Sequence, residues 1–68
     1  MDTETWLRLA RNVGALFSTK REAVFYSKTE AALFWQAVRE RGVSVSPITS
    51  IQFGNAGAYK VAREERRG

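Results

Sequence analysis

The sequence predicts a small α+β single domain over residues 1–68, with two helices packed on a three-stranded sheet in the order α-β-α-β-β. Three observations predict this class. Apolar residues recur with helical spacing in residues 4–17 and 27–41, alternate after Gly42, and meet a Gly-Asn turn signal at 54–55. We expect the charged C-terminal end, residues 63–68, to be solvated and open to fraying.

The first helix is predicted over residues 4–17, with Asp2 or Thr3 as its N-cap. Its apolar face consists of Trp6, Leu9, Ala10, Val13, Leu16 and Phe17. Gly14 weakens this prediction, because a glycine inside a helix costs about 1 kcal/mol relative to alanine. A hairpin of residues 15–17 and 23–26, turning at 19–21, is the competing interpretation, and we prefer the helix.

Residues 22–27 are rich in β-branched and aromatic side chains and are too short for a helix, so we predict a strand there. Ser27 and Glu30 have the spacing of a capping box, which predicts that the second helix begins at Ser27. Gly42 supplies the left-handed residue that ends this helix.

The C-terminal part of the chain predicts a β-hairpin. One parity of residues 43–53 is apolar and is predicted to face inward: Val43, Val45, Pro47, Thr49, Ile51 and Phe53. Residues 54–57 form the turn, and the chain returns with Tyr59 and Val61 on the inward side.

Strand 22–27 is then predicted to lie at an edge of the sheet, because the other two strands pair with each other. Both of its parities are nevertheless apolar: Ala23 and Phe25 on one side, Val24 and Tyr26 on the other. Such an edge needs a cover. The cover is the two helices, a second copy in a homodimer through strand 22–27, or a target protein.

The composition argues against catalysis. The chain has no histidine and no cysteine, which removes the commonest general base, the thiolate nucleophile and most metal ligands. We therefore expect no enzyme, no cofactor and no metal. The longest apolar run, residues 31–35, is far shorter than the roughly 20 residues of a membrane span. Together with an acidic N-terminus, unlike that of a signal peptide, this predicts a cytoplasmic protein without membrane contact.

Positive charge is concentrated between residues 8 and 28, a segment with five basic residues and one carboxylate in a chain of net charge +4. The basic residues are Arg8, Arg11, Lys20, Arg21 and Lys28. They predict a surface that contacts phosphates, and an ordinary solvated face is the alternative.

Two aromatic side chains have a functional interpretation beside a structural one. In the second helix Phe34 shares its face with other apolar residues and is predicted to be core, while Trp35 lies at the border of that face. Trp35 is either a core-edge residue or a hot spot in a partner's pocket. Tyr26 is either packed or part of a platform for a base, with Lys28 or Lys60 as the neighbouring cation.

These patterns lead to two hypotheses. The first is a small basic regulatory protein that engages nucleic acid or a nucleoprotein through Arg8, Arg11, Lys20 and Arg21. The second is a protein-interaction module or inhibitor that docks on an acidic surface of a host enzyme, with Trp35 or strand 22–27 as hot spot. In size and self-containment the chain is similar to small accessory proteins of phages and plasmids, including inhibitors of host defence systems. That resemblance implies the second hypothesis.

Overall fold

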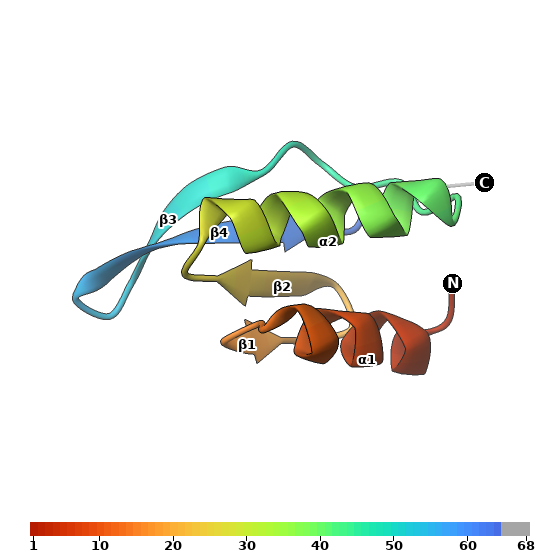
Figure 1. The fold of residues 1–68 in the computed structure, drawn as a ribbon, viewed down its shortest axis with the longest axis horizontal. Coiled ribbons are helices and arrows are strands. Elements are labelled where there is room, and N and C mark those ends of the chain that lie inside the picture. Colours follow the sequence, from red (N-terminus) through yellow and green to blue (C-terminus); the bar gives the residue numbers. More distant parts are fainter. Residues whose placement is uncertain (65–68) are drawn as a thin grey trace.

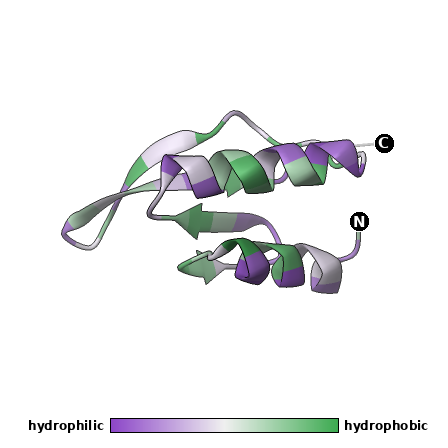
Figure 2. Ribbon diagram, viewed as in Figure 1, coloured by the Kyte–Doolittle hydropathy of each residue, from purple (hydrophilic) through white to green (hydrophobic). Residues whose placement is uncertain are grey.

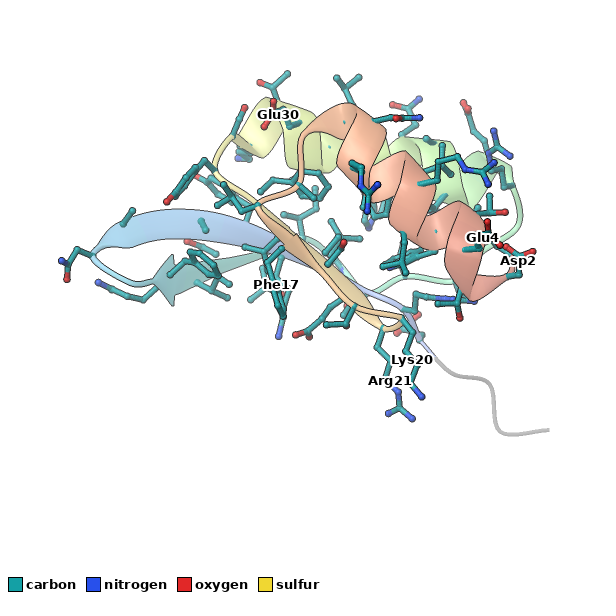
Figure 3. All side chains as sticks on the ribbon, turned by 90° about the horizontal axis from the view of Figure 1, so that it is seen from below. Asp2, Glu4, Phe17, Lys20, Arg21 and Glu30 are labelled. Atoms are coloured by element: carbon teal, nitrogen blue, oxygen red, sulfur yellow. The ribbon has the colours of Figure 1, made fainter. Side chains whose placement is uncertain are left out.

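Two helices lie on one face of a four-stranded antiparallel sheet in the computed structural model of this chain, which describes residues 1–64 (Figures 1 and 3). In chain order the elements are α1 (Thr3–Val13), β1 (Phe17–Ser18), β2 (Glu22–Phe25), α2 (Lys28–Glu40), β3 (Thr49–Phe53) and β4 (Ala56–Ala62). The strand order across the sheet is β1-β2-β4-β3. The predicted α+β class is confirmed, but the three-stranded sheet and the order α-β-α-β-β are wrong.

Helix α1 ends earlier than predicted, and Gly14 is the reason. The Asp2 side chain accepts a hydrogen bond from the Thr5 N–H and caps the start. Gly14 has φ 107°, and the N–H groups of Gly14 and Ala15 bond back to Arg11 and Ala10 in the pattern of a Schellman motif. Gly14 therefore ends the helix, and the chain beyond it is free to form a strand.

The segment after Gly14 forms the hairpin that is the competing interpretation of this part of the sequence. β1 pairs with β2, with Phe17 opposite Val24, and the chain turns between them at residues 19–21. The sequence prediction assigns Phe17 to the apolar face of the first helix because its spacing fits a helix. A strand of two residues is too short to show the alternation by which strands are predicted.

The extra strand changes the position of β2. β2 pairs with β1 on one side and with β4 on the other, so it is an inner strand and not the edge that we predicted. The predicted homodimer through the edge of strand 22–27 thus loses its premise. One apolar parity of β2, Ala23 and Phe25, faces the helices, and Val24 on the other parity faces the opposite side of the sheet.

The main core lies between the helices and the sheet. Phe34 is fully buried, which agrees with the prediction, and its ring centroid lies 4.8 Å from that of Trp6 and 5.3 Å from that of Phe25. The Trp6 and Phe34 rings meet edge to face at 74°, a geometry that aromatic pairs prefer. The buried cluster consists of Trp6, Ala10, Ala23, Phe25, Ala31, Phe34, Val38, Val45 and Val61.

Helix α2 begins and ends as predicted. The Ser27 hydroxyl accepts a hydrogen bond from the Glu30 N–H at 3.3 Å, and Gly42 has φ 84° just beyond the helix. No helix among residues 1–64 is long and apolar enough to cross a membrane.

The predicted C-terminal hairpin is confirmed, but Ile51 and Phe53, which are predicted to face inward, lie on the side of the sheet away from the helices. β3 and β4 are joined by Gly54 and Asn55, so Phe53 pairs with Ala56 and Ile51 with Ala58. A turn with an even number of residues pairs odd-numbered with even-numbered positions, and paired residues share a face. Ile51 and Phe53 therefore lie opposite to the helix-facing Val61, not beside it.

Candidate binding surface

The face of the sheet that the helices leave uncovered, here called the open face, is unusually apolar. The strand register places these side chains on it: Phe17, Glu22, Val24, Thr49, Ile51, Phe53, Ala56, Ala58, Lys60 and Ala62. Tyr26, directly after β2, joins them through its ring contact with Phe53. Phe17 projects from the sheet on the side opposite to the helices (Figure 3). In the hydropathy colouring, β1 and most of β2 are hydrophobic (Figure 2).

Three aromatic rings lie on the open face. Tyr26 directly follows β2 and Phe53 ends β3, and their rings meet edge to face across β4, with centroids 6.5 Å apart. The residue between them on β4 is Ala58, which is only 1% exposed. Its small side chain leaves room for the two rings to meet. Phe17 is a diagonal neighbour of Tyr26 across the β1–β2 pair, a separation of about 7–8 Å between backbone positions.

These rings remain accessible to solvent. Phe17 is 47% exposed and Tyr26 is 53% exposed. Val24, which lies between them, is only 3% exposed. The large side chains thus cover the small ones and present their own outer surfaces.

Cationic side chains lie on the open face and in the β1–β2 turn beside it. Lys60 lies within it, in the row formed by Phe17, Val24 and Thr49, and its Nζ is 3.8 Å from Glu22 Oε2. Lys60 and Glu22 are both partly exposed, so this ion pair is weak and can be exchanged for another partner.

Lys20 and Arg21 occupy the β1–β2 turn, and both side chains project on the open-face side (Figure 3). The core holds the backbone of this turn. The Trp6 indole N–H donates to the Thr19 carbonyl at 2.9 Å. Arg63 donates to the Lys20 carbonyl through its side chain at 3.3 Å and to the Arg21 carbonyl through its backbone N–H at 2.7 Å.

The Thr19 hydroxyl completes this turn by accepting hydrogen bonds from the N–H groups of Arg21 and Glu22, each at 3.2 Å. The Thr19 carbonyl is therefore bonded to the core residue Trp6 and the Lys20 carbonyl to Arg63, while the side chains of Lys20 and Arg21 are exposed. A held backbone lowers the entropy cost of placing these cations against a ligand.

The predicted basic set is divided between two surfaces. At about 100° per residue, Arg8 and Arg11 lie far around α1 from the buried Trp6, on the outward side of the helix layer. Arg8 pairs there with Glu4 at 3.3 Å, and both side chains are exposed. Lys28 opens α2 and also belongs to the helix layer. The structure therefore does not combine these three cations with Lys20 and Arg21.

Trp35 is engaged within the chain. Its indole N–H donates to the Ser46 carbonyl at 2.9 Å, and the Arg39 guanidinium lies 4.5 Å from the ring centroid. This contact holds residues 43–48 against α2. The geometry favours the core-edge interpretation of Trp35 over the hot-spot interpretation.

Sequence reasoning misses Phe17 and Phe53 as surface residues. Periodicity assigns Phe17 to a helix face, and the signal that could correct this is Gly14 as a helix end. Alternation assigns Phe53 inward, and the even length of the Gly-Asn turn could correct that. Tyr26 and Lys60, by contrast, are connected by the sequence as an aromatic residue and its neighbouring cation, and both lie on the open face.

One ionisable group near the helix layer has a shifted pKa. Hydrogen bonding by Thr5, through its side chain and its backbone N–H, lowers the pKa of Asp2. Within residues 1–64, no group of three or more acidic, histidine or cysteine side chains is arranged to hold a metal ion.

No protein-family model matches this chain, and the searches of curated proteins and of solved structures found no significant match.

Proposed function

We propose that this chain is a non-catalytic nucleic-acid-binding protein whose principal phosphate contacts are made by Lys20 and Arg21. The observation that supports this most directly is the β1–β2 turn, which carries two adjacent exposed cations on a backbone held by Trp6 and Arg63. Phosphate contacts of this kind depend on charge and not on base sequence.

The two basic surfaces do not have equal support. The turn cations share the open-face side with Lys60 and with the exposed rings of Phe17 and Tyr26, whereas Arg8 and Arg11 lie on the outward side of α1, in the helix layer. Because the helix layer and the open face point in different directions, one nucleic-acid segment cannot follow both. The turn and the open face are the better candidate, and Arg8 and Arg11 provide a comparison of equal charge.

The test is a fluorescence-anisotropy titration of labelled single-stranded DNA, RNA and duplex DNA at low and near-physiological salt. We expect Kd to rise with salt as phosphate contacts are screened. A K20Q/R21Q variant should bind more weakly, and removal of two contacts should lower the salt slope for a single strand by about 1.4. An R8Q/R11Q variant removes the same formal charge and should retain the slope.

Two results would contradict the proposal in different ways. If binding to every probe vanishes at near-physiological salt, the protein is not a nucleic-acid-binding module, and its charge serves an acidic protein surface instead. If R8Q/R11Q lowers the slope as much as K20Q/R21Q, the turn is not the principal contact. Docking on a protein through Trp35 has less support, because its indole N–H already bonds to Ser46.

A further inference from the structure

We infer that the open face is a stacking platform for single-stranded nucleic acid, on which Phe17 and the Tyr26–Phe53 pair receive bases. This inference rests on the proposed function and assigns it a substrate class. It starts from the exposure of Phe17 and Tyr26, of which about half remains in contact with solvent. Exposed aromatic rings on a sheet face can stack against the flat face of a ligand such as a nucleic-acid base.

The arrangement of the rings fits a chain of bases better than a compact ligand. Phe17 in β1, Tyr26 directly after β2 and Phe53 in β3 follow one another across the sheet, with the ring centroids of Tyr26 and Phe53 6.5 Å apart. A sheet face of this kind offers rings in succession. An extended strand can place one base against Phe17 and another against the Tyr26–Phe53 pair.

The charges complement such a ligand. Lys20 and Arg21 lie in the turn that follows β1, and Lys60 lies two strands away from Phe17 in the same row. The one carboxylate that the described strands place on the open face, Glu22, is the partner of Lys60 at 3.8 Å. A phosphate that approaches Lys60 can take the place of this exposed carboxylate, because the exposed pair holds its geometry only weakly.

The same charges argue against a second copy as the occupant. A two-fold pairing of open faces would remove Lys60 of each copy from water in the middle of the interface. Burying an ammonium group is costly unless it keeps a close ionic partner. A nucleic-acid strand brings a phosphate for each base, so it supplies both the counter-charge and the apolar surface.

Stacking also selects the form of the nucleic acid. Bases in a duplex are stacked on each other, and their flat faces are not available to side chains, whereas a single strand can unstack and lay bases on aromatic rings. We therefore expect single-stranded DNA or RNA to bind more tightly than a duplex of the same sequence.

The test compares a variant that loses both rings with a variant that keeps them. F17L/Y26L retains apolar side chains over Val24 but removes both rings, and F17Y/Y26F exchanges the rings and retains them. Labelled oligothymidylate, oligouridylate and a mixed-sequence duplex serve as probes. We expect F17L/Y26L to raise Kd for the single strands about 10-fold or more and to leave the salt slope unchanged. F17Y/Y26F should bind within about 2-fold of the wild type.

The outcomes separate the inference from the proposed function. If wild-type protein binds no probe at near-physiological salt, the proposed function itself fails. If binding is lost in K20Q/R21Q but is equal in F17L/Y26L and wild type, or if the duplex binds as tightly as the single strands, phosphate contact stands and the stacking platform is overturned. Circular dichroism checks that both aromatic variants are folded. Sedimentation of the free protein that shows a dimer dissolved by F17L/Y26L would assign the open face to self-association and also overturn the inference.

Discussion

The two faces of the sheet are both apolar, yet they differ in what covers them. On the helix side Phe25 and Val61 are fully buried beneath Trp6 and Phe34. On the open face Phe17 is 47% exposed and Tyr26 is 53% exposed. One face of the sheet therefore supplies the core, and the other leaves apolar area in contact with solvent.

The open face is not simply an unfinished core. Its small side chains, Val24 and Ala58, are 3% and 1% exposed because the aromatic rings already cover them. On the open face the large side chains of Phe17 and Tyr26 are exposed, whereas on the helix side the large side chains of Phe25 and Phe34 are buried. From this reversal we expect the rings of the open face to contribute less to stability than the rings of the core, and substitutions on each face can test it.

The largest expected effect is on the covered face. Phe34→Ala removes the ring that contacts both Trp6 and Phe25, and a buried Phe→Ala change costs about 3–5 kcal/mol. Phe17→Ala on the open face should cost about 1 kcal/mol, since only about half of its ring is buried. Urea unfolding followed by tryptophan fluorescence measures both. Equal losses would show that the open face stabilises the fold as much as the core does.

A smaller effect is expected at Gly14, which ends α1 and directs the chain toward β1. Gly14→Ala places a side chain at φ 107°, a conformation that costs an L-residue about 1–2 kcal/mol. A Cβ there would also lie 3.0 Å from Glu30 Oε2.

Gly42→Ala is the matched control for Gly14→Ala. Gly42 also has positive φ, at 84°, but a Cβ added there would meet no neighbouring side chain within 4 Å. Thermal unfolding should show a larger decrease in Tm for Gly14→Ala than for Gly42→Ala. Indistinguishable Tm values would mean that the contact with Glu30 relaxes without cost. They would leave only the backbone conformation as the reason for glycine at both positions.

The smallest effect concerns the helix layer and acid pH. Because Thr5 lowers the pKa of Asp2 in the folded protein, this carboxylate stabilises the fold above its unfolded pKa of about 3.9. The stabilisation is lost as pH falls through the lower folded value. Asp2→Asn still caps a helix but does not titrate, so its Tm should decrease less than that of the wild type between pH 5 and about pH 2. Parallel curves would exclude a contribution from Asp2.

Much of the fold can be predicted where signals are local. Ser27 and Gly42 mark the ends of α2, the Gly-Asn turn marks the hairpin of β3 and β4, and the shared face of Phe34 marks it as core. The candidate surface is predicted only in part. The sequence connects Tyr26 with Lys60 but not Phe17 with Phe53, and it groups Arg8 and Arg11 with cations from which the fold separates them.

The sequence by itself determined the segments whose ends are written in neighbouring residues: the caps of α2, the turn at Gly54 and the absence of histidine and cysteine. Only the tertiary structure decided that β2 is an inner strand, that Phe17 and Phe53 reach the open face, and that the basic residues divide between two surfaces. The physical reason is range. Capping and turns depend on contacts a few residues apart, whereas strand order and the side on which a cation lies depend on pairings between distant segments such as β2 and β4.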